Sequence, residues 1–215
     1  MVRDTILCLC DLTGIMAVPW VEHGYRAVLV DPQHGFSREE GSVVKLALTV
    51  WEAMPYIGDL VRGNRVAFVA AFPPCTDMAV SGARWFDQKR REDPLFQAKA
   101  VDVAEQCRTV GKLSGAPYFV ENPVSVLSGV FGHPDYTFHP FQFTGWCAAD
   151  NYRKRTCLWV GNGFVMPTPR PDMSLGDPDD RIHKCPPGKD RANFRSRTPL
   201  GFARAVFDSN ARTKR

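Results

Sequence analysis

Short apolar runs alternate with amphipathic segments in the first half of the chain. Residues 5–10, 26–30 and 65–71 have the length and apolar content of buried β-strands, and residues 118–120 form a shorter fourth run. A polar or proline-containing turn follows each of them. The pattern predicts strands that alternate with helices, which is typical of a parallel, doubly wound α/β sheet.

Three segments between these runs predict helices. Residues 15–23 have helical spacing, and residues 37–54 can form a second helix. The clearest helix lies between the third and fourth runs, with Asp93 as its N-cap, Pro94 at its first position and Gly115 beyond its end. Its apolar face comprises Phe96, Ala100, Val103, Ala104, Cys107 and Val110.

The pattern becomes irregular after residue 122. Residues 133–143 are aromatic and broken by prolines, and residues 166–189 are dominated by Pro, Gly and Asp, which indicates loops. We expect a catalytic core over residues 1–160, a short loop-rich insert over residues 161–194, and a C-terminal helix within residues 195–215 that completes the core.

Composition favours one compact intracellular protein. Of the 215 residues, 44% are apolar and 23% charged, which suffices for a buried core. No apolar run approaches the roughly 18 residues of a membrane span, and the first 30 residues contain acids and lack a secretory leader pattern. The seven cysteines are dispersed, which favours free thiols in a reducing compartment. We therefore expect a cytoplasmic protein with no membrane partner.

Charge is distributed unevenly along the chain. Residues 1–150 hold 13 Lys and Arg against 17 Asp and Glu, whereas residues 151–215 hold 14 against 6 and carry a net charge of +8. A solvated tail with Arg212, Lys214 and Arg215 explains only three of those basic residues. The basic C-terminal third therefore favours a polyanionic partner such as nucleic acid.

Chemically useful side chains follow the apolar runs, where ligands bind in doubly wound sheets. Pro73 and Pro74 stiffen the backbone before Cys75, so its thiol is expected at the lip of the sheet. Cys75 is either a nucleophile presented there or a buried structural thiol. Glu121, which ends the fourth run, either faces the same crevice or caps a helix or pairs with an arginine.

Seven short blocks occur in a fixed order along residues 11–199. They are Asp11-Leu12-Thr13-Gly14, Asp31, Gly58-Asp59-Leu60, Phe72-Pro73-Pro74-Cys75, Glu121-Asn122-Pro123, Asn151-Tyr152-Arg153-Lys154-Arg155 and Arg195-Ser196-Arg197-Thr198-Pro199. In this order they resemble the motifs of DNA cytosine-5 methyltransferases, especially the small single-domain members of bacteriophages. The resemblance implies a Rossmann-like fold of the class I methyltransferase type, S-adenosyl-L-methionine as cofactor, and double-stranded DNA with a flipped base as partner.

The resemblance also implies a role for each block. Cys75 would add to carbon-6 of cytosine and turn the ring into an enamine whose carbon-5 can accept a methyl group. Glu121 would act beside ring nitrogen 3, and Arg155, supported by Arg153, beside the ring carbonyl. Asp31 would hold the ribose and Asp59 the adenine. The full set of implied cofactor contacts is Asp11, Leu12, Thr13, Gly14, Asp31, Asp59, Leu60 and Pro73.

Further residues would contact DNA. Arg84 and Trp85 lie where the family has a mobile catalytic loop, and the basic region contributes Lys184, Lys189, Arg191 and Arg195. The aromatic residues either stack on a nucleobase or pack on a hairpin face; they are Tyr136, Phe138, Phe141, Phe143 and Trp146. His183 and Cys185 lack a Cys-x-x-Cys partner motif, so we expect no metal site.

The chain departs from the family pattern in ways that matter. Its first loop lacks the usual glycine cluster, and the last cofactor-contacting block is missing. Only about 35 residues separate Val160 from Arg197, where the family inserts a target-recognition domain, so we expect low sequence specificity. Two other functions stay open: modification of a free cytosine nucleotide, and DNA binding on a decayed methyltransferase scaffold. The oligomeric state also stays open.

Overall fold

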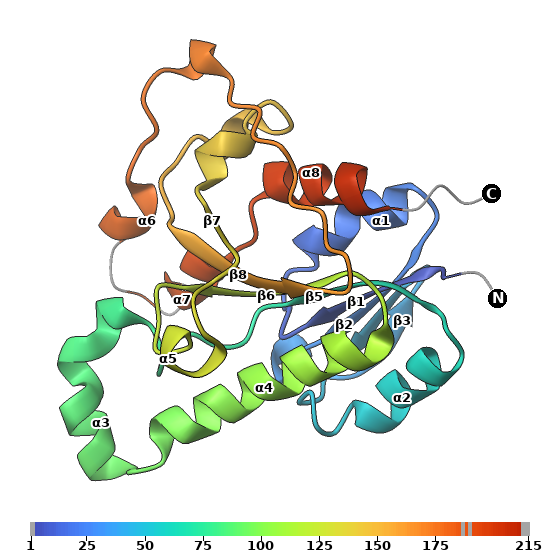
Figure 1. The fold of residues 1–215 in the computed structure, drawn as a ribbon, viewed down its shortest axis with the longest axis horizontal. Helices are drawn as coiled ribbons and strands as arrows, with labels where there is room; N and C mark the ends of the chain where they lie inside the picture. The colour runs from blue at the N-terminus through green and yellow to red at the C-terminus, as the bar shows by residue number, and fades with distance from the viewer. Residues whose placement is uncertain (1–2, 186–187, 189–190, 212–215) are drawn as a thin grey trace.

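The computed structural model describes residues 3–185, 188 and 191–211. Within them, eight strands form one sheet in the order β3-β4-β2-β1-β5-β6-β8-β7, with helices on both faces (Figure 1). The strands are β1 Thr5–Leu9, β2 Arg26–Val30, β3 Arg38–Glu40, β4 Val43–Leu46, β5 Val66–Ala71, β6 Tyr118–Pro123, β7 Tyr136–Phe138 and β8 Thr156–Gly161.

The sheet is mixed but mostly parallel. Strands β4, β2, β1, β5 and β6 run parallel to one another. Strand β3 is antiparallel to β4, and β8 is antiparallel to both of its neighbours, β6 and β7. This arrangement confirms the predicted α/β fold and is compatible with a Rossmann-like architecture.

Helices cover both faces of this sheet (Figure 1). The 3₁₀ helix η1 (Ile15–Ala17), α1 (Val18–Glu22) and α8 (Leu200–Asn210) pack together on one face, and α2 (Met54–Arg62) and α4 (Phe96–Ser114) cover the other. The remaining helices are η2 Pro32–His34, η3 Val80–Trp85, α3 Phe86–Glu92, α5 Ser128–Phe131, η4 Pro140–Phe143, η5 Ala148–Asp150, η6 Met173–Leu175, α6 Arg181–Lys184 and α7 Arg191–Ser196.

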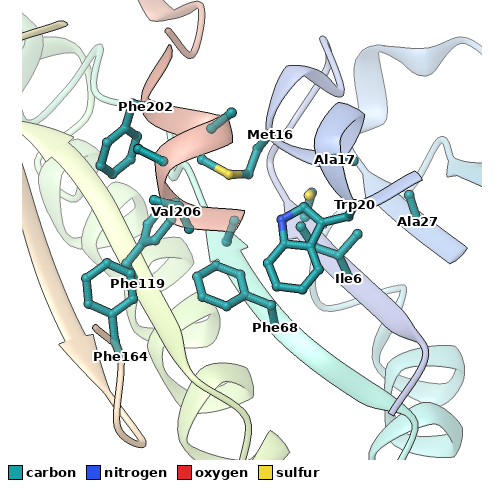
Figure 2. Packing of buried hydrophobic residues seen from close by; sticks show 14 of the residues in the cluster. Ile6, Met16, Ala17, Trp20, Ala27, Phe68, Phe119, Phe164, Phe202 and Val206 are labelled. Carbon is teal, nitrogen blue, oxygen red and sulfur yellow. The ribbon is translucent and has the colours of Figure 1, made fainter. Parts of the chain in front are cut away.

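Aromatic side chains fill the core beneath α1 and α8 (Figure 2). Trp20 of α1 is fully buried, and its ring centroid lies 5.2 Å from that of Phe68 in β5. Phe202 of α8 stacks on Phe138 of β7 at 4.0 Å and lies 5.3 Å from Phe143. Phe138 and Phe143 are thus core residues, which favours packing over base stacking for this pair.

The predicted helix over residues 37–54 is wrong. This segment contains the β3–β4 hairpin, and α2 begins only at Met54. Gly41 has a φ of +60°, which allows the tight turn between the two strands. The side chains of β4 alternate between half-buried and buried, and Val44 pairs with Val28 of β2. Pairing with a distant strand therefore overrides the helical spacing that the sequence suggests.

Other predicted elements hold with small shifts. The clearest predicted helix is α4, which begins at Phe96 rather than at Pro94, while Asp93 accepts a hydrogen bond from the Leu95 amide at 3.0 Å. The predicted loop region 166–189 is irregular over most of its described residues, but it also contains the short helices η6 and α6. None of the described helices combines the length and the apolar character that crossing a membrane requires.

Candidate active site

Cys75 lies in a tight turn that follows β5. The Asn122 amide nitrogen Nδ2 donates a hydrogen bond to the carbonyl oxygen of Pro73 at 2.9 Å, and the backbone amides of Met78 and Ala79 donate to the carbonyl oxygen of Cys75. Pro73 is buried and Cys75 is half-buried. The end of β6 thus holds the turn, and the thiol is fixed at the edge of the sheet, as the sequence predicts.

Glu121 and Lys154 form an ion pair close to this thiol. The Lys154 Nζ lies 3.8 Å from the Glu121 Oε1, and the two side chains are only 12% and 13% exposed. Burial raises the pKa of Glu121, and the Lys154 ammonium opposes that rise. Burial and the charge of Glu121 raise the pKa of Cys75, while Lys154 and Arg195 lower it. The structure therefore brings together Cys75, Glu121 and two cations.

Lys154 is a site residue that the sequence interpretation missed. Glu121 pairs with Leu158 of β8, and alternate residues of a strand point to the same face. Counting back in twos from Leu158 leads through Thr156 to Lys154, and the ion pair confirms that Lys154 reaches Glu121. The sequence alone does not show the pairing of β6 with β8 on which this position depends.

The two flanking arginines lie elsewhere. Arg153 donates a hydrogen bond to the carbonyl oxygen of Pro178 and lies 3.7 Å from the carboxylate of Asp180. Arg155 is exposed, and its charge acts on Cys157, which belongs to the core cluster beside α4. Among the described residues, neither arginine forms an ion pair with Glu121, whose partner is Lys154.

Asp11 and Asp31 follow β1 and β2 at the same edge of the sheet. The Asp11 Oδ1 accepts hydrogen bonds from the Thr13 amide, the Thr13 hydroxyl and the Gly14 amide at 2.8–3.0 Å. Its Oδ2 is buried and has no hydrogen-bond partner in the described part of the chain. Burial raises the pKa of Asp11, and the charge of Asp31 adds to that effect. Asp31 is buried and caps η2 through the Gln33 amide.

The remaining predicted cofactor contacts divide into two groups. Leu12, Thr13 and Gly14 lie with Asp11, and Pro73 lies in the Cys75 turn. Asp59 and Leu60 instead belong to α2: Asp59 is exposed and pairs with Arg62 at 2.5 Å, and Leu60 is a core residue. Helix α2 leads from β4 back to the start of β5, so these two residues are not brought to the edge that carries Asp11. An exposed aromatic residue, Trp51, follows β4 at that edge instead.

A pocket of about 420 Å³ is lined by Tyr152, two residues before Lys154. Burial is the main cause of the raised pKa of the Tyr152 phenol; the charge of Asp150 adds to the rise, and the charge of Glu121 makes a smaller contribution. Asp150 on the pocket wall accepts a hydrogen bond from the Gly201 amide at 2.6 Å. The remaining lining residues are Ile15, Val18, Cys147, Ala149, Arg181, Ile182, Phe194, Arg197, Thr198 and Leu200.

The described residues among the predicted DNA contacts lie in η3, α6 and α7. Trp85 is 51% exposed, and the guanidinium of Arg84 lies 5.1 Å from its ring centroid. Lys184 is exposed at the end of α6, and Arg191 begins α7. Arg195 in α7 acts electrostatically on Cys75, and its Nε is buried and unpartnered among the described residues. Lys189 lies outside the described residues.

The comparisons with known proteins leave the chain unassigned. No protein-family model matches it, and no curated protein sequence is significantly similar to it. The described residues also contain no group of three or more His, Cys, Asp or Glu side chains that could hold a metal ion. The motifs and the geometry of the site are therefore the basis for a functional proposal.

Proposed function

We propose that this protein transfers a methyl group from S-adenosyl-L-methionine to carbon-5 of cytosine in DNA. The observation that carries the proposal is the convergence of Cys75, Glu121 and Lys154 at one edge of the sheet. A thiol, a carboxyl group and a cation are the three groups that nucleophilic addition to a cytosine ring requires.

Each of these side chains has a step in the reaction. The Cys75 sulfur forms a bond to carbon-6 of the base. Glu121, in its protonated form, donates to ring nitrogen 3, and Lys154 stabilises the negative charge that develops on the ring carbonyl. Burial raises the pKa of Glu121, which favours that protonated form. When bound, S-adenosylmethionine supplies an electrophilic methyl group on its sulfonium.

Asp11 and Asp31 fit the cationic cofactor. The unpartnered Oδ2 of Asp11 is a buried acceptor that an ammonium group can satisfy, and Asp31 adds a second carboxylate. The ring of Trp51 is available for stacking on adenine, in place of the contact predicted for Asp59. The amides of Thr13 and Gly14 already bind Asp11, so the cofactor would be held by side-chain charge rather than by a glycine loop.

The architecture supports a class I methyltransferase. Parallel strands β1, β2, β5 and β6 bring Asp11, Asp31, Cys75 and Glu121 to one edge. Helix α8 packs against η1 and α1, and its first residue, Leu200, lines the same pocket as Ile15. Helix α8 therefore lies beside the first loop, residues 11–14. In the family, the last motif, which this chain lacks, would contact the cofactor at this place.

DNA is the proposed partner because several cations of this region form no ion pair. Among the residues that the structure describes, Arg84, Arg91, Lys184 and Arg197 form no ion pair. Arg197 lines the pocket, and α3, which carries Arg91, is joined to the Cys75 turn by the bond from Lys89 to the carbonyl oxygen of Thr76. Unpaired cations of this kind suit phosphate groups.

One observation favours a second candidate, DNA binding without catalysis. The Asp11 carboxylate occupies the two backbone amides that a glycine loop would leave free for a ligand. If that carboxylate blocks the cofactor, the scaffold binds DNA only.

Incubation with labelled S-adenosylmethionine and plasmid DNA, followed by nucleoside analysis, separates these candidates. We expect labelled 5-methylcytosine with the wild type and none with Cys75→Ser. A thermal shift with the cofactor, of the size expected from RT ln(1 + [L]/Kd), tests the pocket independently. DNA binding without a shift and without labelled product would replace the proposal with the second candidate.

A further inference from the structure

Glu121 and Lys154 form a mostly buried ion pair beside the turn that carries Cys75, and Asn122, the residue after Glu121, holds that turn through the carbonyl oxygen of Pro73. The Lys154 ammonium lies 3.8 Å from the Glu121 carboxylate, and it also acts on the Cys75 thiol. Other charged or titratable groups act on this cluster of Cys75, Glu121 and Lys154 from the packed elements: Tyr152 before β8, Cys157 in β8 and Arg195 of α7. Asp77, which shares the turn with Cys75, is neutralised by Lys89 at 2.5 Å.

We propose that Lys154 is a cation shared between Glu121 and Cys75, and that it changes partner when a proton moves between them. This inference rests on the proposed function. The S–H bond of Cys75 breaks and its electron pair stays on sulfur, while the proton binds a carboxylate oxygen of Glu121 directly or through a water molecule. One negative charge thereby moves from oxygen to sulfur, and the total charge of the three groups is unchanged.

This transfer prepares two catalytic groups in one step. It produces a thiolate, which is the reactive form of cysteine, and a neutral carboxylic acid, which can donate to ring nitrogen 3. Neither product has to exchange a proton with bulk solvent. A lysine suits the shared position because its ammonium is a compact charge on a flexible stem, whereas a guanidinium would lock onto the carboxylate in a fixed fork.

Alkylation of Cys75 by iodoacetamide tests the inference without cofactor or DNA. The rate is measured from about pH 6 to about pH 10, and the Cys75 peptide is quantified by mass spectrometry because other thiols are also present. Lys154→Met should slow alkylation about tenfold below the midpoint, which corresponds to a shift of about one pH unit. Glu121→Gln should accelerate it, because the competing charge is gone. Arg155→Met, which removes a neighbouring cation, is the matched control and should leave the profile unchanged.

A double-variant cycle separates a shared cation from simple proximity. Lys154→Met should slow alkylation more in the Glu121→Gln background than in the wild type, because Glu121 no longer competes for the ammonium. Effects that are equal in both backgrounds overturn the inference, as does an Arg155→Met shift as large as that of Lys154→Met.

Separate controls test whether each variant folds and whether the protein methylates DNA. Circular dichroism checks each variant, and if Lys154→Met does not fold, Glu121→Gln alone decides, since unaccelerated alkylation overturns the inference. If Lys154→Met slows alkylation more in the Glu121→Gln background than in the wild type, but the protein methylates no DNA, the shared cation is supported and the proposed methyl transfer is refuted. Methylated DNA together with additive alkylation effects supports the methyl transfer and refutes the shared cation.

Discussion

The side chain of Asn122 joins the end of β6 to the turn that carries Cys75. Its Nδ2 donates to the carbonyl oxygen of Pro73 at 2.9 Å, and the side chain is fully buried. Asn122 follows Glu121 directly, so one short stretch of β6 supplies the carboxyl group of the site and also fixes the position of the thiol.

Removing this bond should cost stability and activity together. In Asn122→Ala the buried carbonyl oxygen of Pro73 loses its donor, which should lower the free energy of unfolding by about 1–3 kcal/mol. Urea denaturation measures the loss. Asn151→Ala, whose side-chain bonds to Leu175 and Gly176 are exposed, is the control and should change stability by less than about 0.5 kcal/mol. Equal losses would show that Asn122 does not hold the turn.

Two helical glycines should respond to alanine with opposite signs. A Cβ at Gly201 in the first turn of α8 would overlap the carbonyl oxygen of Phe143. A Cβ at Gly58 in α2 would meet only the flexible end of Arg62, at 3.2 Å. Gly58→Ala should therefore raise the free energy of unfolding by up to about 1 kcal/mol, whereas Gly201→Ala should lower it. Stabilisation by both substitutions, measured in urea, would contradict the close packing of α8.

Asp11 should make stability depend on pH. Burial holds its folded pKa above the ordinary value of 3.8, so the folded state binds the proton more tightly than the unfolded state. The stability that Asp11 adds through this tighter proton binding is fully present below about pH 3.8, and it is lost as the pH rises through the raised pKa. Asp11→Asn keeps an acceptor oxygen but has no charge. The stability of this variant relative to wild type should therefore increase between pH 4 and pH 7.

Denaturant titrations at both pH values measure this difference. A constant or shrinking difference would mean that the folded pKa of Asp11 is not raised. The same variant should reduce the thermal shift with S-adenosylmethionine, because one of the two carboxylates that face the cationic cofactor is gone.

Much of the fold was predictable because its strands are local apolar runs. Strands β1, β2 and β5 coincide with runs 5–10, 26–30 and 65–71 to within one residue. The β3–β4 hairpin was not predictable in this way, because it depends on the pairing of β4 with β2, a strand outside the hairpin segment. Pro55, in the first turn of α2, indicates where that helix begins. Asp59 consequently lies inside α2, away from the site.

The positions of Cys75 and Glu121 at the edge of the sheet were predictable, whereas the cation that lies beside Glu121 was not. Cys75 and Glu121 end apolar strands, where parallel sheets place functional groups. Arg153 and Arg155 were preferred to Lys154 because of motif resemblance. The ion pair with Glu121 identifies Lys154 instead, and it depends on the pairing of β6 with β8, which only the structure supplies.

DNA affinity should depend steeply on salt. With about 35 residues in place of a recognition domain, binding is expected through phosphates, and each neutralised phosphate contributes a slope of about −0.9 to log K against log salt. Lys184→Gln should reduce that slope by about 0.9, whereas Lys112→Gln, in the last turn of α4, should not.

Bisulfite sequencing of a fully methylated plasmid should show many modified cytosines. Modification confined to one motif of about four or more base pairs would mean that the short insert or a partner reads sequence.

The most direct test of the central claim is covalent trapping on DNA that contains 5-fluorocytosine. The final elimination that releases Cys75 requires a base to remove the proton at carbon-5. Fluorine replaces that proton and cannot be removed in this way, so the elimination is blocked. With S-adenosylmethionine present, the wild type should form a complex with DNA that survives denaturing electrophoresis, joined through the Cys75 peptide. Cys75→Ser, checked for folding, should form none. Absence of the complex with the wild type, or its persistence in Cys75→Ser, would contradict Cys75 as the nucleophile of a cytosine-5 methyl transfer.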